Sequence, residues 1–268
     1  MTFVDIDRSN PTVPVVTLNR PERLNALGTV LVAELKAAMG GLSRDREARV
    51  VIIAAAGRAF CAGADLQGGE GPAPDAEGRG PVGSIYRSQE HIAELMTAIH
   101  ECEKPVIAAV HGAAVGGGLA IALACDLRVA DATAVFGSVF INVGLSSCDM
   151  GTSYFLPRIV GATRAAELML TGRHFDAAEA DRFGMLNRLV PAGEALDAAR
   201  DLAEAVAANN EYGVWMTKKG LWENIDSPSY RHALEVENRT QVLGTFTGNM
   251  NEAMRAFNEK RAPDWGPM

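Results

Sequence analysis

Short runs rich in β-branched residues alternate with stretches of helical periodicity from residue 13 to residue 190. The runs are VPVVTLNR from Val13, RVVIIAAAG from Arg49, KPVIAAVHG from Lys104, and CDLRVAD from Cys125 followed by AVFGS. Buried strands have this composition, and strands separated by helices form sheets in which neighbouring strands run parallel. The alternation therefore predicts an α/β fold with short crossover connections.

Two helices are predicted between these strands. The first covers residues 25–42, where Leu27, Leu31, Leu35, Ala38 and Leu42 recur at helical spacing. We expect Asn25 to cap its start and Gly40-Gly41 to end it. The second covers residues 84–102, and its apolar stripe contains the following side chains: Ile85, Ile92, Leu95, Met96 and Ile99.

The pattern changes after Asp176. Only NRLVP, from Asn187, still resembles a strand, and four helical segments follow, at residues 194–209, 212–225, 229–244 and 249–261. We therefore expect a core domain over residues 1–200 and a helical region over residues 201–268. The last helix carries an apolar stripe of Met250, Met254 and Phe257, which we expect to pack within the chain, with a subunit interface as the alternative.

Charge and hydropathy exclude several classes of protein. Lys and Arg number 25 against 33 Asp and Glu, and no basic run occurs, so nucleic acid is not an expected partner. The longest apolar run, from Ala113 to Cys125, is too short to span a membrane, and Asp5 and Asp7 stand where a signal peptide needs apolar residues. The four cysteines show neither zinc-ligand nor disulfide spacing. These features predict a cytoplasmic protein without a metal.

The stretch GGEGPAPDAEGRGPVG, residues 68–83, has no periodicity and is rich in glycine and proline. We predict a loop here. A loop of this length in a compact domain is either a cover over a site or a linker, and we favour the cover.

Two strand-to-turn elements could carry chemistry. One strand runs into Cys61-Ala62-Gly63-Ala64-Asp65, and another runs into Gly116-Gly117-Gly118 and a helix of small residues. Glycine turns that open helices expose unpaired backbone N–H groups, and the helix dipole adds positive potential there. The pattern indicates an anion or oxyanion site, although three glycines could equally serve to let a helix pack closely.

Nucleotide motifs do not fit this glycine turn. A dinucleotide fingerprint that starts at Gly116 would need glycine at position 121, which is isoleucine. A phosphate-binding loop would need a Gly-Lys pair, and no lysine lies between Lys104 and Lys218. Both interpretations fail.

Several motifs in order resemble the crotonase (enoyl-CoA hydratase/isomerase) family over nearly the whole chain. They are LNRPERLNAL, AFCAGADL, AAVHGAAVGGGLAIALACDLRVAD and LPRIVGATRAAELMLTGRHFDAAEADRFGMLNRLV. The resemblance implies a spiral of ββα units with a C-terminal helical region that builds a homotrimer or a dimer of trimers. It also implies coenzyme A thioester substrates, with the thioester oxygen held by the N–H groups of Ala64 and Gly117 as an enolate develops.

The same resemblance implies contacts for the coenzyme A part of the substrate, and no separate cofactor. Backbone groups of three residues would meet adenine and pantetheine: Ala62, Asp65 and Leu66. Arg23 matches a position near the phosphates. Phe257 and Lys260 match a C-terminal stretch that contacts the nucleotide from a neighbouring subunit.

Two positions depart from the hydratases of this family. Their acid/base glutamates correspond here to Ala120 and Phe140, neither of which can transfer a proton. Asp149 is the candidate substitute base that the resemblance implies, because isomerases and a dehalogenase of the family resemble this chain in placing an aspartate in the same turn. The alternative is that Asp149 caps the following helix.

Other nucleophiles and bases are weaker candidates. Cys148 and Ser146-Ser147 lack a histidine nearby in sequence to activate them. We expect His111 to be structural and the other four histidines to lie on the surface.

The expected function is therefore an acyl-CoA enzyme that stabilises a thioester enolate, with double-bond isomerisation through Asp149 as its simplest form. Hydrolysis or dehalogenation through Asp149 and a non-catalytic acyl-CoA-binding scaffold stay open as alternatives. Hydration by two glutamates is not expected.

Overall fold

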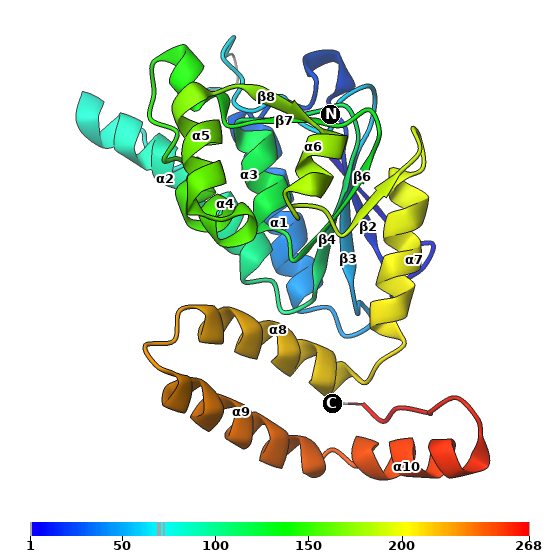
Figure 1. Cartoon of the computed structure of the whole chain (residues 1–268). Helices are drawn as coiled ribbons and strands as arrows, with labels where there is room; N and C mark the ends of the chain where they lie inside the picture. The colour runs from blue at the N-terminus through cyan, green and yellow to red at the C-terminus, as the bar shows by residue number, and fades with distance from the viewer. Residues whose placement is uncertain (1, 69–70, 72, 268) are drawn as a thin grey trace. The chain divides into compact units, whose positions relative to one another are not determined.

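The computed structural model describes residues 2–68, 71 and 73–267, and the chain forms two compact units that divide between Ala203 and Glu204. The first unit is α/β and the second is helical (Figure 1). Each unit is described by itself below.

The main sheet of the first unit has six strands in the order β1-β2-β3-β4-β6-β9. Strand β1 pairs antiparallel with β2, and the other neighbours run parallel. The strands are β1 (Val4–Asp7), β2 (Val15–Leu18), β3 (Val51–Ala55), β4 (Val106–Val110), β6 (Leu127–Asp131) and β9 (Arg188–Val190). The predicted runs form the parallel strands, whereas β1 was not predicted because its polar residues face outward.

A second, smaller sheet has the order β5-β7-β8 and positions the glycine turn. Its strands are β5 (Ala113–Val115), β7 (Val135–Gly137) and β8 (His174–Asp176). Each of β4 and β6 is followed within a few residues by a strand of this second sheet. The succession β4-β5-α3, with α3 at Gly117–Ala124, is the ββα unit expected of the crotonase fold.

Helices α1 (Thr29–Ser43), α2 (Pro81–His100), α3 and α4 (Thr152–Val160) pack in succession, with α2 touching both α1 and α3 and α3 touching α4. Helix α3 is buried over its whole length. The remaining helical segments of this unit are η1 (Pro21–Arg23), η2 (Val139–Val143), α5 (Ala162–Thr171), α6 (Ala177–Arg182) and α7 (Ala195–Ala207), whose last turn crosses the boundary.

Two predictions about α1 are wrong at its ends, although its predicted stripe is buried. Asn25 is not the cap, because Gly28 holds that position and Asn25 lies outside the helix with φ of 54°. The Asn25 amide instead donates to the carbonyls of Ala56 and Ala59, at 2.9 and 2.8 Å. Gly40-Gly41 does not end the helix, which continues for two more residues, through the buried Leu42 to Ser43.

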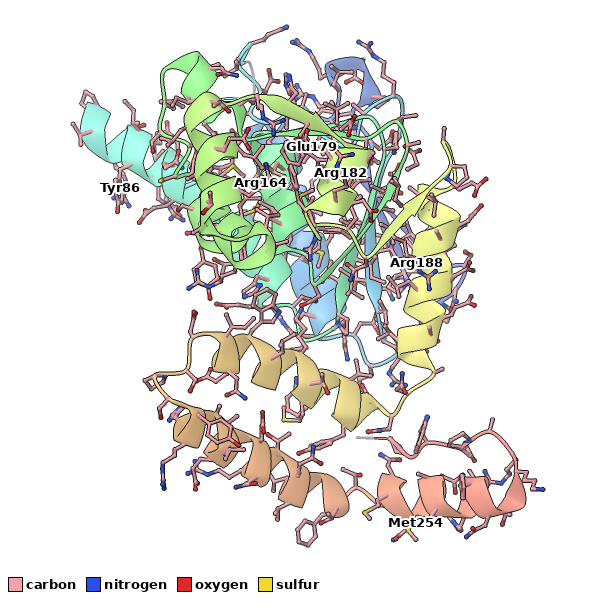
Figure 2. All side chains as sticks on the ribbon, viewed as in Figure 1. Tyr86, Arg164, Glu179, Arg182, Arg188 and Met254 are labelled. Carbon is pink, nitrogen blue, oxygen red and sulfur yellow. The ribbon has the colours of Figure 1, made fainter. Side chains whose placement is uncertain are left out.

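Helix α2 begins earlier than predicted, at Pro81, and only its C-terminal half is buried. Leu95, Met96 and Ile99 are buried as expected, but Ile85 is 72% exposed, so the stripe does not continue to the N-terminal end. Tyr86 likewise stands out from this end of α2 (Figure 2).

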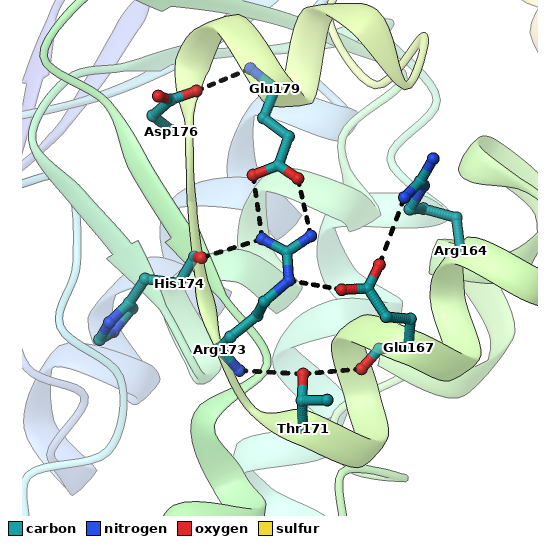
Figure 3. Close-up of polar contacts among 7 residues, drawn as sticks. All are labelled: Arg164, Glu167, Thr171, Arg173, His174, Asp176 and Glu179. Carbon is teal, nitrogen blue, oxygen red and sulfur yellow. Dashed lines mark hydrogen bonds and ion pairs between the residues drawn. The ribbon is translucent and has the colours of Figure 1, made fainter.

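A cluster around Arg173 fixes β8 between α5 and α6 (Figure 3). The Arg173 guanidinium pairs with Glu167 at 2.5 Å and with both oxygens of Glu179 at 2.7 and 2.9 Å. The hydrogen bonds from Arg173 hold the pKa of each glutamate below its ordinary value. Strand β8 in turn pairs with β7, which ends at Gly137 beside the glycine turn.

The second unit contains α8 (Glu211–Ile225), α9 (Tyr230–Thr245) and α10 (Asn249–Glu259). The hydroxyl of Tyr212 on α8 donates to the Thr240 carbonyl on α9 at 2.8 Å. On α10 the predicted stripe of Met250, Met254 and Phe257 is 60%, 57% and 84% exposed. The stripe therefore does not pack against the other helices of the second unit.

Among the described residues, no helix combines the length and the apolar character that crossing a bilayer requires.

Candidate active site

The two strand-to-turn elements singled out in the sequence lie side by side in the first unit. Cys61 forms a parallel bridge with Ala114. The Cys61 N–H donates to the Ala113 carbonyl at 2.9 Å, and the Cys61 carbonyl accepts from the Val115 N–H at 3.1 Å. A Cβ atom on Gly63 would lie 3.3 Å from the Gly117 nitrogen. The turn before Ala64 therefore touches the turn that opens α3.

The N–H groups of Ala64, which is exposed, and of Gly117, which is buried, share one property. Leu27 forms a parallel bridge with Ala64 through the residues on either side of it. The Leu27 N–H donates to the Gly63 carbonyl (2.7 Å), and the Asp65 N–H donates to the Leu27 carbonyl (3.0 Å), so neither bond uses the Ala64 N–H. In the part of the chain that the structure describes, neither the Ala64 nor the Gly117 N–H donates a hydrogen bond. Gly117 is also the first residue of α3, where the helix dipole is positive. This arrangement suits a developing oxyanion.

Close packing of α3 also requires the glycines. The two explanations of the triplet, an oxyanion site and close helix packing, are therefore compatible. A Cβ on Gly118 would lie 2.1 Å from the Cys61 carbonyl oxygen, which excludes any side chain there. Gly116 has φ of 54° and ψ of −117°, a conformation open only to glycine, and its N–H donates to the Gly137 carbonyl at 2.9 Å. The Arg173 cluster thus supports the turn through β8 and β7.

The two positions of the hydratase glutamates are apolar in space as well as in sequence. Ala120 is fully buried within α3. Phe140 is 7% exposed, and its ring lies 3.9 Å from a Cβ placed on Gly116. An aromatic edge therefore faces the glycine turn where the family resemblance would place a carboxylate.

Asp149 is half-buried in the turn before α4, and it does not cap that helix. Gly151 occupies the cap position without a side-chain hydrogen bond. The Asp149 Oδ1 instead accepts from the Met150 N–H at 2.7 Å and from the Gln89 side chain of α2. Met150 reaches the oxyanion turn, because its Sδ would lie 3.2 Å from a Cβ on Gly117. The carboxylate is thus one residue from a side chain that touches this turn.

Backbone donors near the expected coenzyme A contacts are partly occupied. The N–H groups of Ala62 and Asp65 donate to the carbonyls of Leu24 and Leu27, each at 3.0 Å, so contacts to adenine or pantetheine would use the remaining backbone groups. The Asp65 carboxylate forms a buried ion pair with Arg20 at 2.9 Å. This side chain therefore holds the turn in place.

The other expected contacts lie at the surface. Leu66 is 76% exposed, and Arg23 is half-buried with its guanidinium donating to the Gln67 side chain. Phe257 and Lys260 belong to the second unit, where Lys260 ends α10 in a left-handed conformation. Their contact with a neighbouring subunit's nucleotide stays a prediction.

Cys61 and His111 lie near the site, and their surroundings show what each side chain does. Burial raises the pKa of the Cys61 thiol to about 12, so it stays protonated beside the glycine turn and is no nucleophile. His111 contacts the Gly57 carbonyl through Nε2 at 2.9 Å, as a structural histidine would. Among the described residues, no three His, Cys, Asp or Glu side chains are placed to hold a metal ion.

The sequence analysis missed two residues of α2 near the site. Gln89 contacts Asp149, and no pattern in the sequence marks it. His91 was expected on the surface but is 6% exposed. Its position four residues before Leu95, on the buried stripe, is the signal that predicts its burial.

Comparison with known proteins agrees with this geometry. Residues 8–267 match the family model for enoyl-CoA hydratase/isomerase. A probable enoyl-CoA hydratase of Mycobacterium tuberculosis, EchA12, is 39% identical over 98% of this chain and 92% of its own.

Two solved structures are similar. A probable enoyl-CoA hydratase/isomerase from Mycobacterium abscessus is 38% identical over 98% of each chain, with a TM-score of 0.93. A monofunctional enoyl-CoA isomerase from M. smegmatis is 38% identical over 87% of this chain and 99% of its own, with a TM-score of 0.72. The chain belongs to the enoyl-CoA hydratase/isomerase family of acyl-CoA enzymes, within the crotonase superfamily.

Proposed function

We propose that this protein shifts the double bond of an enoyl-CoA, with Ala64 and Gly117 as oxyanion donors and Asp149 as the acid/base. The observation that carries the proposal is the pair of unpaired N–H groups on touching turns, with the half-buried Asp149 one residue before Met150, whose side chain reaches the Gly117 turn. Two donors that hold one oxygen would favour a thioester enolate, since each is typically worth about 2.7–4 kcal/mol in a transition state.

The proton balance of the proposed step is simple. The Asp149 carboxylate removes a proton from the α carbon of a β,γ-unsaturated thioester, and the electron pair moves onto the thioester oxygen held by the two N–H groups. The same carboxyl group then returns the proton to the γ carbon, so that the double bond lies between the α and β carbons. No water and no second acid enter the reaction.

The surroundings of Asp149 fit this role. The Gln89 amide and the Met150 N–H both donate to Oδ1, which orients the carboxylate. Within the described part of the chain Oδ2 has no hydrogen-bond partner, so it is the oxygen that takes the proton. Hydration would need a further acid/base residue, and Ala120 and Phe140 supply none at the hydratase positions.

The names of the relatives support acyl-CoA chemistry without choosing the reaction. EchA12 is named a hydratase, and the M. smegmatis protein an isomerase.

The test compares wild type with Asp149→Asn, using β,γ- and α,β-enoyl-CoA substrates followed by NMR in deuterated water. We expect the variant to lose about 10²–10⁴-fold in rate while binding acyl-CoA within about threefold of wild type, since general acid/base catalysis contributes that much. Asp197→Asn is the matched control, because Asp197 lies on α7 with its side chain 81% exposed. It should retain full rate.

Three outcomes would overturn the proposal. Hydration of crotonyl-CoA that survives Asp149→Asn would show that another residue is the base. Release of free coenzyme A would assign the protein to thioester hydrolysis. Binding of acyl-CoA without turnover of any enoyl-CoA would make the protein a binding scaffold.

A further inference from the structure

Arg128 is a buried arginine of the first unit, on the strand that follows α3. The residue is 8% exposed and lies in β6, two residues beyond the Cys125 that ends the helix. Arginine is seldom buried unless a carboxylate pairs with it. In the part of the chain that the structure describes, the hydrogen-bond acceptors of this guanidinium are backbone carbonyls, and no carboxylate lies within ion-pair distance.

These carbonyls place the guanidinium at the C-terminal end of α3. Nη1 donates to the carbonyls of Cys125 and Ala122, at 2.7 and 3.3 Å. Nη2 donates to the Asp126 carbonyl at 3.3 Å, and Nε donates to the Met185 carbonyl at 2.8 Å. The last carbonyls of a helix have no partner within it, and they form the negative end of the helix dipole. Arg128 therefore closes this end of α3 with a positive charge.

The guanidinium stays charged although it is buried. Burial lowers the pKa of Arg128, and the nearby side chains of Cys125 and Asp126 raise it. Because the ordinary pKa of arginine lies far above neutral pH, the group keeps its proton in proteins. The carboxylate of Asp126 is directed to another strand, where its Oδ2 accepts from the Val106 N–H at 2.8 Å.

Helix α3 connects Arg128 to the oxyanion site. Its first residue is Gly117, and all of its eight residues are buried. At a rise of 1.5 Å per residue, the guanidinium lies about 12–15 Å from the Gly117 N–H, along the helix axis. Every residue of this path belongs to the described part of the chain, whereas residues 69, 70 and 72 of the predicted cover lie outside it.

A buried charge at this distance affects an enolate more than it affects a neutral thioester. Water screens little along a path of buried residues, so an effective dielectric constant of about 20 applies. At about 12–15 Å, a unit positive charge then favours a unit negative charge about tenfold. The neutral thioester carries no full charge, so its binding is almost unaffected.

We propose that Arg128 is a positioning residue of the oxyanion site, which acts through α3 by holding the C-terminal end of this helix and adding positive potential at the Gly117 N–H. The proposal rests on the proposed function, because it requires the Gly117 N–H to hold a thioester oxygen. Arg128 itself touches no substrate, and no bond forms or breaks there.

The test measures how easily a bound probe ionises. The probe is acetoacetyl-CoA, whose enolate and neutral forms differ in ultraviolet absorption. Bound to wild type, it should ionise at a lower pH than free in solution. In Arg128→Gln the ratio of enolate to neutral probe at a given pH should fall about tenfold, as the loss of one charge at this distance predicts. Calorimetry should show that the affinity for neutral butanoyl-CoA stays within about threefold.

Two further variants separate the charge from the hydrogen bonds. Arg128→Lys keeps the charge but lacks the planar fork of donors, and it should restore most of the enolate ratio. Asp126→Asn removes the negative charge that opposes Arg128 and keeps an oxygen for the Val106 N–H, so its enolate ratio should rise above that of wild type. Mere loosening of the helix end would lower the ratio in every variant. Arg239→Gln is the matched control, because this side chain is 75% exposed in the second unit, and its ratio should equal that of wild type.

The outcomes distinguish the two proposals. An unchanged enolate ratio in Arg128→Gln, a ratio in Arg128→Lys as low as in Arg128→Gln, or a ratio in Asp126→Asn at or below that of wild type would overturn the role of Arg128 and leave the acyl-CoA function intact. If wild type binds neither thioester, or its bound probe ionises like the free one, both proposals fail. Because Asp126→Asn keeps the hydrogen bonds of the guanidinium, it decides the question even where Arg128→Gln does not fold.

Discussion

The close contact between α3 and Cys61 predicts that Gly118→Ala damages both stability and the oxyanion site. The new Cβ would lie 2.1 Å from the Cys61 carbonyl oxygen and 2.9 Å from its carbon, whereas ordinary contact begins at 3.4 Å. Cys61 cannot withdraw easily, because hydrogen bonds of 2.9 and 3.1 Å tie it to Ala113 and Val115. The start of α3 must therefore move.

The magnitude follows from this displacement. Overpacking of a well-packed core costs about 1–3 kcal/mol. For a core unit of this size each kcal/mol lowers Tm by about 2–4 °C, so Tm should fall by about 2–12 °C. Because Gly117 precedes the substituted residue, its N–H shifts too, and a misplacement of about 1 Å costs about 10²-fold in rate. The assays are thermal unfolding and enoyl-CoA turnover.

Two further glycine variants complete the series. Gly41→Ala in α1 meets no atom within 4 Å, so it should leave turnover unchanged and raise Tm slightly, since alanine stabilises a helix interior by about 0.5–1 kcal/mol. Gly117→Ala meets the movable ends of Leu27 and Met150, so its Tm should fall less than that of Gly118→Ala. If Gly118→Ala has the same Tm and the same turnover rate as Gly41→Ala, then α3 is not held against Cys61 as described.

Three other substitutions test the surroundings of the site. Asn25→Ala removes a fully buried amide with three hydrogen bonds and should cost about 3 kcal/mol in urea unfolding; a change below about 1 kcal/mol would contradict this account. Asp65→Asn leaves the buried Arg20 guanidinium without its charge partner and should cost about 3–5 kcal/mol in the same assay, whereas an unchanged urea midpoint would show that the pair contributes nothing. The pKa of His91 is lowered in the folded state, so the unfolded chain binds its proton first: stability is complete above pH 6.5 and is lost as the pH falls below that value. Urea unfolding at pH 7.5 and 5.5 should therefore show a smaller loss for His91→Phe than for wild type, and equal losses would refute the burial effect.

The strand pattern, the helical stripes and the glycine turns were predictable from the sequence because they depend on local chemistry. Runs such as VVIIAA and VIAAV have few alternatives to a buried strand, and the positive-φ position at Gly116 is open only to glycine. Two of the family motifs follow the same logic, since AFCAGADL and AAVHGAAVGGGLAIALACDLRVAD contain these turns. The place of Asp149 in the turn that precedes α4 was also predictable, whereas its role as a base stays a prediction.

The ends of elements and the partners of side chains depended on contacts between distant segments. Asn25 resembles a helix cap in the sequence, but its side-chain amide donates hydrogen bonds to the carbonyls of Ala56 and Ala59, more than 30 residues away. Gly40-Gly41 stays helical because Leu42 is buried against the core, and burial outweighs the low helix propensity of glycine.

The amino-acid order alone determined that two glycine-bearing turns would follow two buried strands. Only the tertiary structure decided that these turns touch, that Gln89 from α2 reaches Asp149, and that His91 lies inside with an unpaired nitrogen. The physical reason is the distance along the sequence between the interacting residues. Neighbouring residues set the backbone conformation and the burial of a strand, whereas the partner of a polar side chain depends on which helix packs beside it.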